Sequence, residues 1–131
     1  MEKGAYVDGF LLVVPKNKVP EYIKLAEDAK KLWLKHGALA YKECAGDDLN
    51  PTPPEGMEEM RPLSFVTAVK AGADETVWFS FIVFKSREHR DKVNAKVIEE
   101  MKKEMAGHKD MPMPFDMKRV FYGGFKVEVG D

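Results

Sequence analysis

Residues 75–97 read ETVWFSFIVFKSREHRDKVNAKV, and this stretch indicates a strand that leads directly into a helix. The run from Thr76 to Phe84 is almost wholly apolar and rich in aromatic and β-branched residues. A strand with one face in water alternates apolar and polar residues, so this run predicts a central strand covered on both faces. Ser86 is the expected N-cap of the helix. Apolar residues then recur at helical spacing, at Val93, Val97, Met101 and Met105.

Length and composition favour one domain spanning residues 1–131, with a core of its own. The net charge is −1 and 33% of residues are charged, so no basic excess points to nucleic acid. The single cysteine, Cys44, has no partner for an internal disulfide, which fits a reducing compartment. The chain shows neither a signal-peptide cleavage site nor an apolar run as long as a membrane span. A soluble, cytoplasmic protein without a membrane partner is expected.

The N-terminal part predicts a strand followed by a helix. In residues 6–14 both sets of alternate residues are largely apolar (apolar at both parities), so both faces of the strand are expected to be covered. This strand is therefore also expected to be central, and Pro15 ends it. Asn17 is the expected cap of the helix, and Pro20 is tolerable in a first turn. The apolar stripe of this helix comprises Tyr22, Leu25, Ala26, Ala29, Leu32, Trp33 and His36. Gly37 is expected to end it.

The remaining segments complete a mixed pattern. Residues 38–45 predict a more polar strand nearer an edge, and residues 46–62 predict a loop, with 47–61 as an excursion from the domain. A short strand is expected over residues 63–70. The last strand is expected over residues 119–129, where the pair Gly123-Gly124 indicates a bulge or a close backbone approach.

The order strand, helix, strand, strand, helix, strand predicts an α+β protein of ferredoxin-like βαββαβ type, with an antiparallel four-stranded sheet. Two helices cover only one face of such a sheet. Because the first, third and last strands are apolar at both parities, the second face needs a cover. The simplest cover is a second copy, so a homodimer with facing sheets is expected.

Several stretches carry a resemblance to a known family: residues 6–10 (YVDGF), 36–39 (HGAL), 41–44 (YKEC), 77–97 and 113–116 (MPFD), together with Arg119 and residues 122–125 (YGGF). In these stretches the chain resembles the bacterial domain-of-unknown-function family 1428, also called YbaA-like. The resemblance implies a dimeric α+β barrel. It implies no catalytic residue, because the family has no established activity. The acidic loop 47–61 is the part that departs most from the family.

One candidate site is a polar group on one face of the sheet. By strand parity, Tyr6 and Asp8 share a face, and Trp78, Ser80, Tyr122 and Lys126 are expected to join them. An acid buried among aromatic side chains is desolvated, which suits a general base. The alternative is that Asp8 is simply paired, with Lys126 or with a residue of a second copy.

A second candidate is the start of the helix that follows Ser86. Arg90 and Asn94 lie four residues apart on one face, where they could hold an anionic group of a ligand. The alternative is ordinary capping with an Arg87–Asp91 pair at i, i+4 spacing. His36 is a further candidate base, although a histidine in a last helical turn also interacts favourably with the helix dipole.

The sequence excludes several common sites. It has no GxGxxG, Walker, CxxC or HExxH motif, so no nucleotide or zinc cofactor is expected. His108 with Met111, Met113 and Met117 could bind Cu(I), but methionine is also an ordinary gap filler, and no metal is expected.

The leading hypothesis is therefore a homodimer that binds a small organic molecule, with cofactor-independent oxygenation or isomerisation as the expected chemistry if it is an enzyme. The pocket would draw on Asp8, His36, Arg90, Asn94 and aromatic side chains. One alternative is a non-catalytic dimeric scaffold or stress protein. The other is RNA binding, because aromatic residues on a four-stranded sheet can stack bases.

Overall fold

The protein was analysed as a computed structural model that describes residues 1–60, 63–107 and 113–131. Its strands are β1 (Tyr6–Pro15), β2 (Ala40–Ala45), β3 (Glu75–Phe84) and β4 (Phe121–Lys126). Its α-helices are α1 (Val19–Lys35), α2 (Phe65–Val69) and α3 (Arg87–Glu104). Four 3-10 turns occupy Lys16–Lys18, Glu58–Met60, Met105–Gly107 and Met117–Arg119. None of the described helices is long and apolar enough to cross a membrane.

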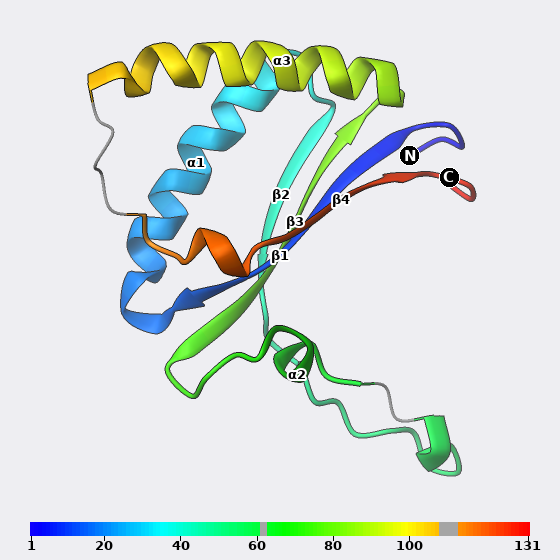
Figure 1. Cartoon of the computed structure of the whole chain (residues 1–131). Coiled ribbons are helices and arrows are strands. Elements are labelled where there is room, and N and C mark those ends of the chain that lie inside the picture. The colour runs from blue at the N-terminus through cyan, green and yellow to red at the C-terminus, as the bar shows by residue number, and fades with distance from the viewer. Residues whose placement is uncertain (61–62, 108–112) are drawn as a thin grey trace.

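The four strands form one antiparallel sheet in the order β2-β3-β1-β4. β1 and β3, which the sequence predicts to be central, lie at the centre, whereas the last strand lies at an edge although both sets of its alternate residues are also apolar. β2 and β4 form the edges. The α+β class and the antiparallel four-stranded sheet are confirmed, and the order of strands and long helices agrees with a ferredoxin-like fold (Figure 1).

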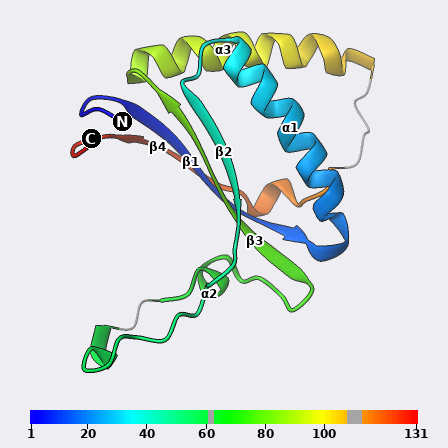
Figure 2. The same cartoon turned by 180° about the vertical axis from the view of Figure 1, so that it is seen from behind.

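The long helices α1 and α3 lie together on one side of the sheet (Figures 1 and 2). On this helix-covered face, Leu12 and Val14 of β1 are buried with Tyr22 and Ala26 of α1. Towards the other end, buried residues of β3 and α3 form a second cluster with Ala38; they are Ile82, Phe84, Val93 and Val97. Burial of these side chains is the main force that holds the helices to the sheet.

The opposite side of the sheet, here called the open face, remains largely bare. Its central and β4 residues are Val7, Gly9, Leu11, Phe79, Phe81, Phe121, Gly123 and Phe125. At one end α2 covers it, because Val69 packs against Val13 and Val77. Elsewhere Phe79, Phe121 and Phe125 are 49%, 54% and 63% exposed.

Four of the glycines lie where an added side chain would meet a neighbouring ring or where the backbone has a positive φ. The ring of Phe125 lies over the backbone of Gly9 and Gly123, where an added Cβ would meet it at 3.4 and 3.5 Å. At Gly124 a Cβ would collide with the ring of Tyr6, so the close approach predicted for the glycine pair is confirmed. Gly37 has φ +111°, which confirms it as the residue that ends α1.

Three local predictions are wrong. Residues 63–70 contain the helix α2 instead of a strand, because the Ser64 hydroxyl accepts a hydrogen bond from the Val66 N–H (3.1 Å) and caps it. Asn17 does not cap α1; the N-cap position is Lys18, with no side-chain hydrogen bond, although Pro20 does lie in the first turn. The strands β2 and β4 are shorter than the segments 38–45 and 119–129.

Candidate functional site

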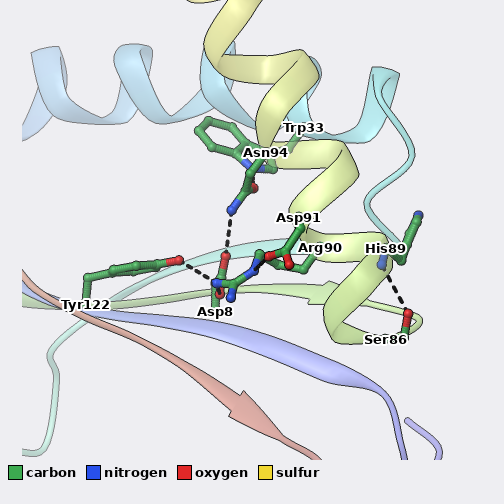
Figure 3. A network of polar contacts seen from close by, with 8 residues as sticks. All are labelled: Asp8, Trp33, Ser86, His89, Arg90, Asp91, Asn94 and Tyr122. Atoms are coloured by element: carbon green, nitrogen blue, oxygen red, sulfur yellow. Dashed lines mark hydrogen bonds and ion pairs between the residues drawn. The ribbon is translucent and has the colours of Figure 1, made fainter.

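Two carboxylates lie between the sheet and the long helices, and each is the centre of a polar cluster. The first is Asp8, which is 1% exposed. Arg90 Nη1 lies 2.7 Å from Asp8 Oδ1, and Asn94 Nδ2 donates to Asp8 Oδ2 at 3.2 Å (Figure 3). Arg90 and Asn94 come from successive turns of α3, so the prediction that they share a face is confirmed. Both of them hold the same carboxylate.

Arg90 has further partners that fix its guanidinium group. Nη1 donates to the Tyr122 hydroxyl at 2.7 Å, and Nε pairs with Asp91 Oδ1 at 2.8 Å (Figure 3). The guanidinium carbon lies 4.8 Å from the centre of the Tyr6 ring, a cation–π distance. The alternative pairings expected from the sequence are not found: Asp91 pairs with Arg90 and not with Arg87, and Asp8 pairs with Arg90 and not with Lys126.

The start of α3 places this cluster. Ser86 caps the helix as predicted, since its hydroxyl accepts from the His89 N–H at 3.1 Å. On the far side, Trp33 Nε1 donates to Asn94 Oδ1 at 3.0 Å and orients the amide (Figure 3). Trp33 was assigned only to the apolar stripe of α1. Both oxygens of Asp8 thus have charged or amide donors, and the geometry is that of a satisfied ion pair.

Other predicted site residues lie elsewhere. His36 Nε2 is 3.1 Å from Glu100 Oε1, which also pairs with Lys35 Nζ at 2.7 Å, so His36 joins the end of α1 to α3. Trp78 Nε1 donates to Thr76 Oγ1 at 2.9 Å. Trp78 shares the helix-covered face with Asp8 but does not hydrogen-bond to its cluster.

The second cluster is centred on Glu43 of β2, which no sequence pattern marked as a site residue. The Tyr22 hydroxyl lies 2.9 and 3.0 Å from the two carboxylate oxygens, and the Ser80 hydroxyl donates to Oε2 at 3.0 Å. Within residues 1–60, 63–107 and 113–131, no lysine, arginine or histidine forms an ion pair with Glu43. In the part of the chain that the structure describes, the donors to this carboxylate are neutral hydroxyls.

The pKa values of the titratable groups in the two clusters are shifted by burial and by different neighbouring groups. Burial raises the pKa of the Glu43 carboxyl, and the hydrogen bonds from Tyr22 and Ser80 only partly oppose this. Burial, with the adjacent Glu43 charge, also raises the pKa of Tyr22 and of Tyr41, so both phenols stay neutral. Burial and then the charge of Asp8 raise the pKa of Tyr122 in the first cluster, where Arg90 opposes the rise.

Glu43 borders a recess of about 330 Å³ that opens beside α1. The recess is lined by Ile23, Ala26, Glu27, Lys30, Tyr41, Glu43, Ala45 and Trp78. Apolar walls with a few convergent polar groups are typical of small-molecule sites. Neither Asp8 nor Arg90 lines this recess or the hollow on the open face.

No cluster of metal ligands is found among the described residues. His108 and Met111, from the Cu(I) alternative, lie outside the described residues. Met113 and Met117 are 38% and 66% exposed.

Comparison with known proteins identifies the family. Residues 5–117 match the model of the family described as "Protein of unknown function (DUF1428)". The chain is 39% identical over 121 residues to the uncharacterized protein YbaA of Escherichia coli (strain K12) and to that of Shigella flexneri. Each alignment covers 92% of this chain and 94% of the relative. The chain therefore belongs to the DUF1428 family.

Proposed function

We propose that the protein is a homodimer that binds a small organic molecule. The observation that carries this proposal is the contrast between the two sides of the sheet. The open face presents a hollow of about 610 Å³ walled by phenylalanines, which suits a protein partner. The helix-covered side has a smaller recess with polar groups, which suits a small ligand.

A second copy is the partner that best fits the open face. Phe79, Phe121 and Phe125 are exposed on the same face of one sheet, with Leu11 of β1 between Phe79 and Phe121. Contiguous apolar patches of this kind are typical of interaction surfaces. A two-fold axis over the sheet would let each copy cover the patch of the other with the same residues. Nucleic acid fits less well, because the net charge of −1 gives no electrostatic attraction to phosphate.

Native mass spectrometry of the purified protein tests both parts of the proposal. We expect a dimer, and we expect Phe125→Glu to convert it to monomer because the substitution places two charges in the apolar interface. Ile98→Glu is the matched control, since Ile98 is also exposed (51%) but lies on α3, away from the sheet. A wild-type monomer would overturn the homodimer.

The ligand is proposed to lie beside Glu43, in place of the Asp8 site that the sequence favours. Asp8 and Arg90 already satisfy each other, so a ligand would have to break an ion pair to use either group. If the ligand is also turned over, Glu43 is the better proton acceptor for cofactor-independent isomerisation or oxygenation, because its raised pKa brings it closer to neutral pH. Small-molecule mass retained by the native dimer would support binding.

The non-catalytic scaffold is the second candidate, and the saturated Asp8 cluster favours it. A buried ion pair with every oxygen occupied is what a purely structural role would show. The scaffold predicts a dimer that retains no ligand and binds no small molecule in the recess. RNA binding would instead give a salt-sensitive gel shift of RNA that Phe125→Glu abolishes.

A further inference from the structure

We propose that the recess beside Glu43 binds a small organic ammonium ion, with the Glu43 carboxylate as its counter-ion and aromatic rings as its walls. This inference rests on the proposed small-molecule function and adds the site and the chemical class of the ligand. It follows from three properties of the recess: its charge, its walls and its size.

The negative charge of Glu43 in the recess has no cationic partner among the described residues. Glu43 is half-buried, and its hydrogen bonds come from the neutral hydroxyls of Tyr22 and Ser80. Buried carboxylates are normally paired with a cation, and partial burial removes part of the solvation of Glu43. The cation that lines the recess, Lys30, is held by Glu27, with Nζ 2.9 Å from Oε2. A ligand cation would supply the missing counter-charge.

The walls favour a cation with an apolar body. Trp78 and Tyr41 line the recess, and the Tyr22 ring lies behind it, 4.9 Å from the Trp78 ring. Faces of aromatic rings attract ammonium groups, and tryptophan does so most strongly. Ile23 and Ala26 add apolar contact on the side of α1. The volume of about 330 Å³ lies at the small end of ligand pockets, which indicates a ligand of few heavy atoms.

Competing ligand classes fit less well. An anion would be repelled by the Glu43 carboxylate, which no described cation neutralises. A neutral alcohol could donate one hydrogen bond but would leave the charge uncompensated. The Asp8 cluster shows the contrast, because there Arg90 already fills the position that a ligand cation would take beside Glu43.

The test compares three probes of one shape: benzylamine, benzyl alcohol and benzoate, titrated into the full-length protein by calorimetry. Benzylamine is an ammonium ion at neutral pH, benzyl alcohol is neutral and benzoate is an anion. We expect benzylamine to bind about 10- to 100-fold more tightly than benzyl alcohol, because hydrogen bonds to charged groups are the stronger ones. Benzoate should bind more weakly still.

Glu43→Gln should reduce benzylamine affinity to that of benzyl alcohol, since glutamine keeps the shape of the side chain and removes its charge. Glu100→Gln is the matched control: it is the same change at a carboxylate that pairs with Lys35 and His36 outside the recess. It should leave benzylamine affinity unchanged.

The pH profile of the wild-type protein provides a test without any variant. Benzylamine affinity should fall as the pH is lowered from neutral into the acid range, because protonation of Glu43 removes the counter-charge. The groups that face Glu43 are Tyr22, Glu27 and Lys30 from α1, Tyr41 from β2 and Ser80 from β3. Both tyrosines stay neutral and the pKa of Glu27 is lowered by Lys30, so Glu43 is the group that titrates.

Three results would overturn the inference: no binding of benzylamine, equal binding of benzyl alcohol, or benzylamine binding that survives both Glu43→Gln and low pH. These results are separable from failure of the proposed function. Binding of benzyl alcohol or benzoate in the recess would keep the small-molecule function and remove only the ammonium class. A monomer in native mass spectrometry would remove the homodimer and leave the ligand class to be decided by the titrations.

Discussion

Asp8 and Glu43 are two carboxylates on the same face of one sheet, and they are stabilised in different ways. Asp8 is fully buried and paired with the cation Arg90 at 2.7 Å. Glu43 is half-buried and, among the described residues, accepts only from tyrosine and serine hydroxyls. The first arrangement is closed to further partners, whereas the second leaves a charge beside an accessible recess. The contrast shows that burial of an acid does not by itself mark a functional site, because the identity of its partners decides whether the charge remains available.

The largest effect is expected for Arg90→Ala. It leaves Asp8 as a buried carboxylate without a counter-ion, which typically costs about 3–5 kcal/mol of folding free energy. Urea denaturation followed by circular dichroism measures the loss. Arg87→Ala is the matched control in the same helical turn, where the side chain is exposed, and should change stability by less than about 0.5 kcal/mol. Unchanged stability in Arg90→Ala would contradict the structural role of the ion pair.

A smaller loss is expected for Tyr22→Phe. The substitution removes the hydroxyl that lies within 3.0 Å of both oxygens of Glu43 and leaves the ring in place. A hydrogen bond to a charged acceptor contributes about 1.5–3 kcal/mol, so a loss of that size is expected at neutral pH in urea denaturation. At acid pH the loss should shrink, since the protonated carboxyl depends less on the donor. A loss that does not change with pH would indicate that packing, and not the carboxylate, is responsible.

Much of the fold could be predicted from residue patterns. Apolar residues on both faces of β1 and β3 predicted that these strands are central, and the strand order confirms it. The same pattern in the last strand was not decisive, because β4 lies at an edge. Ser86 predicted the start of a helix because a hydroxyl cap acts within one turn, and Gly37 predicted the end of a helix because glycine readily adopts a positive φ. The segment with α2 was assigned wrongly because a short run of apolar and β-branched residues, Phe65–Val69, fits either a strand or a helix.

The site was less predictable because it depends on register. Arg90 and Asn94 could be placed on one face of a helix, but their contact with Asp8 requires knowing how α3 lies across β1. Glu43 lies in the polar segment that predicted an edge strand. Alternation places it on one face with Tyr41, but only its contact with Tyr22 of α1 shows that this face lies beneath α1. The third member, Tyr22, was recognised only as part of an apolar stripe.

The pH dependence of stability separates the two carboxylates further. The folded-state pKa of Glu43 is raised above its ordinary value of 4.5, so the native protein binds this proton more tightly than the unfolded chain does. Deprotonation of Glu43 therefore destabilises the folded state relative to the unfolded chain as the pH rises through the raised pKa. This destabilisation is absent below about pH 4.5. Glu43→Gln should thus gain stability relative to wild type as the pH rises above about 4.5. Parallel unfolding curves of the two proteins at each pH provide the measurement, and a constant difference would show that Glu43 does not titrate in this window.

The smallest effect is expected for Tyr122→Phe, which is the same hydroxyl deletion as Tyr22→Phe, made in the Asp8 cluster. Tyr122 is 54% exposed, and Arg90 keeps its pairs with Asp8 and Asp91 when the hydroxyl is removed. Water can replace the lost partner of the guanidinium, so a change within about 0.5 kcal/mol is expected in urea denaturation. Because the two substitutions remove the same atom, their difference measures how much each carboxylate depends on a neutral donor. A loss as large as that of Tyr22→Phe would mean that Arg90 alone does not hold Asp8, and the two clusters would then be of one kind.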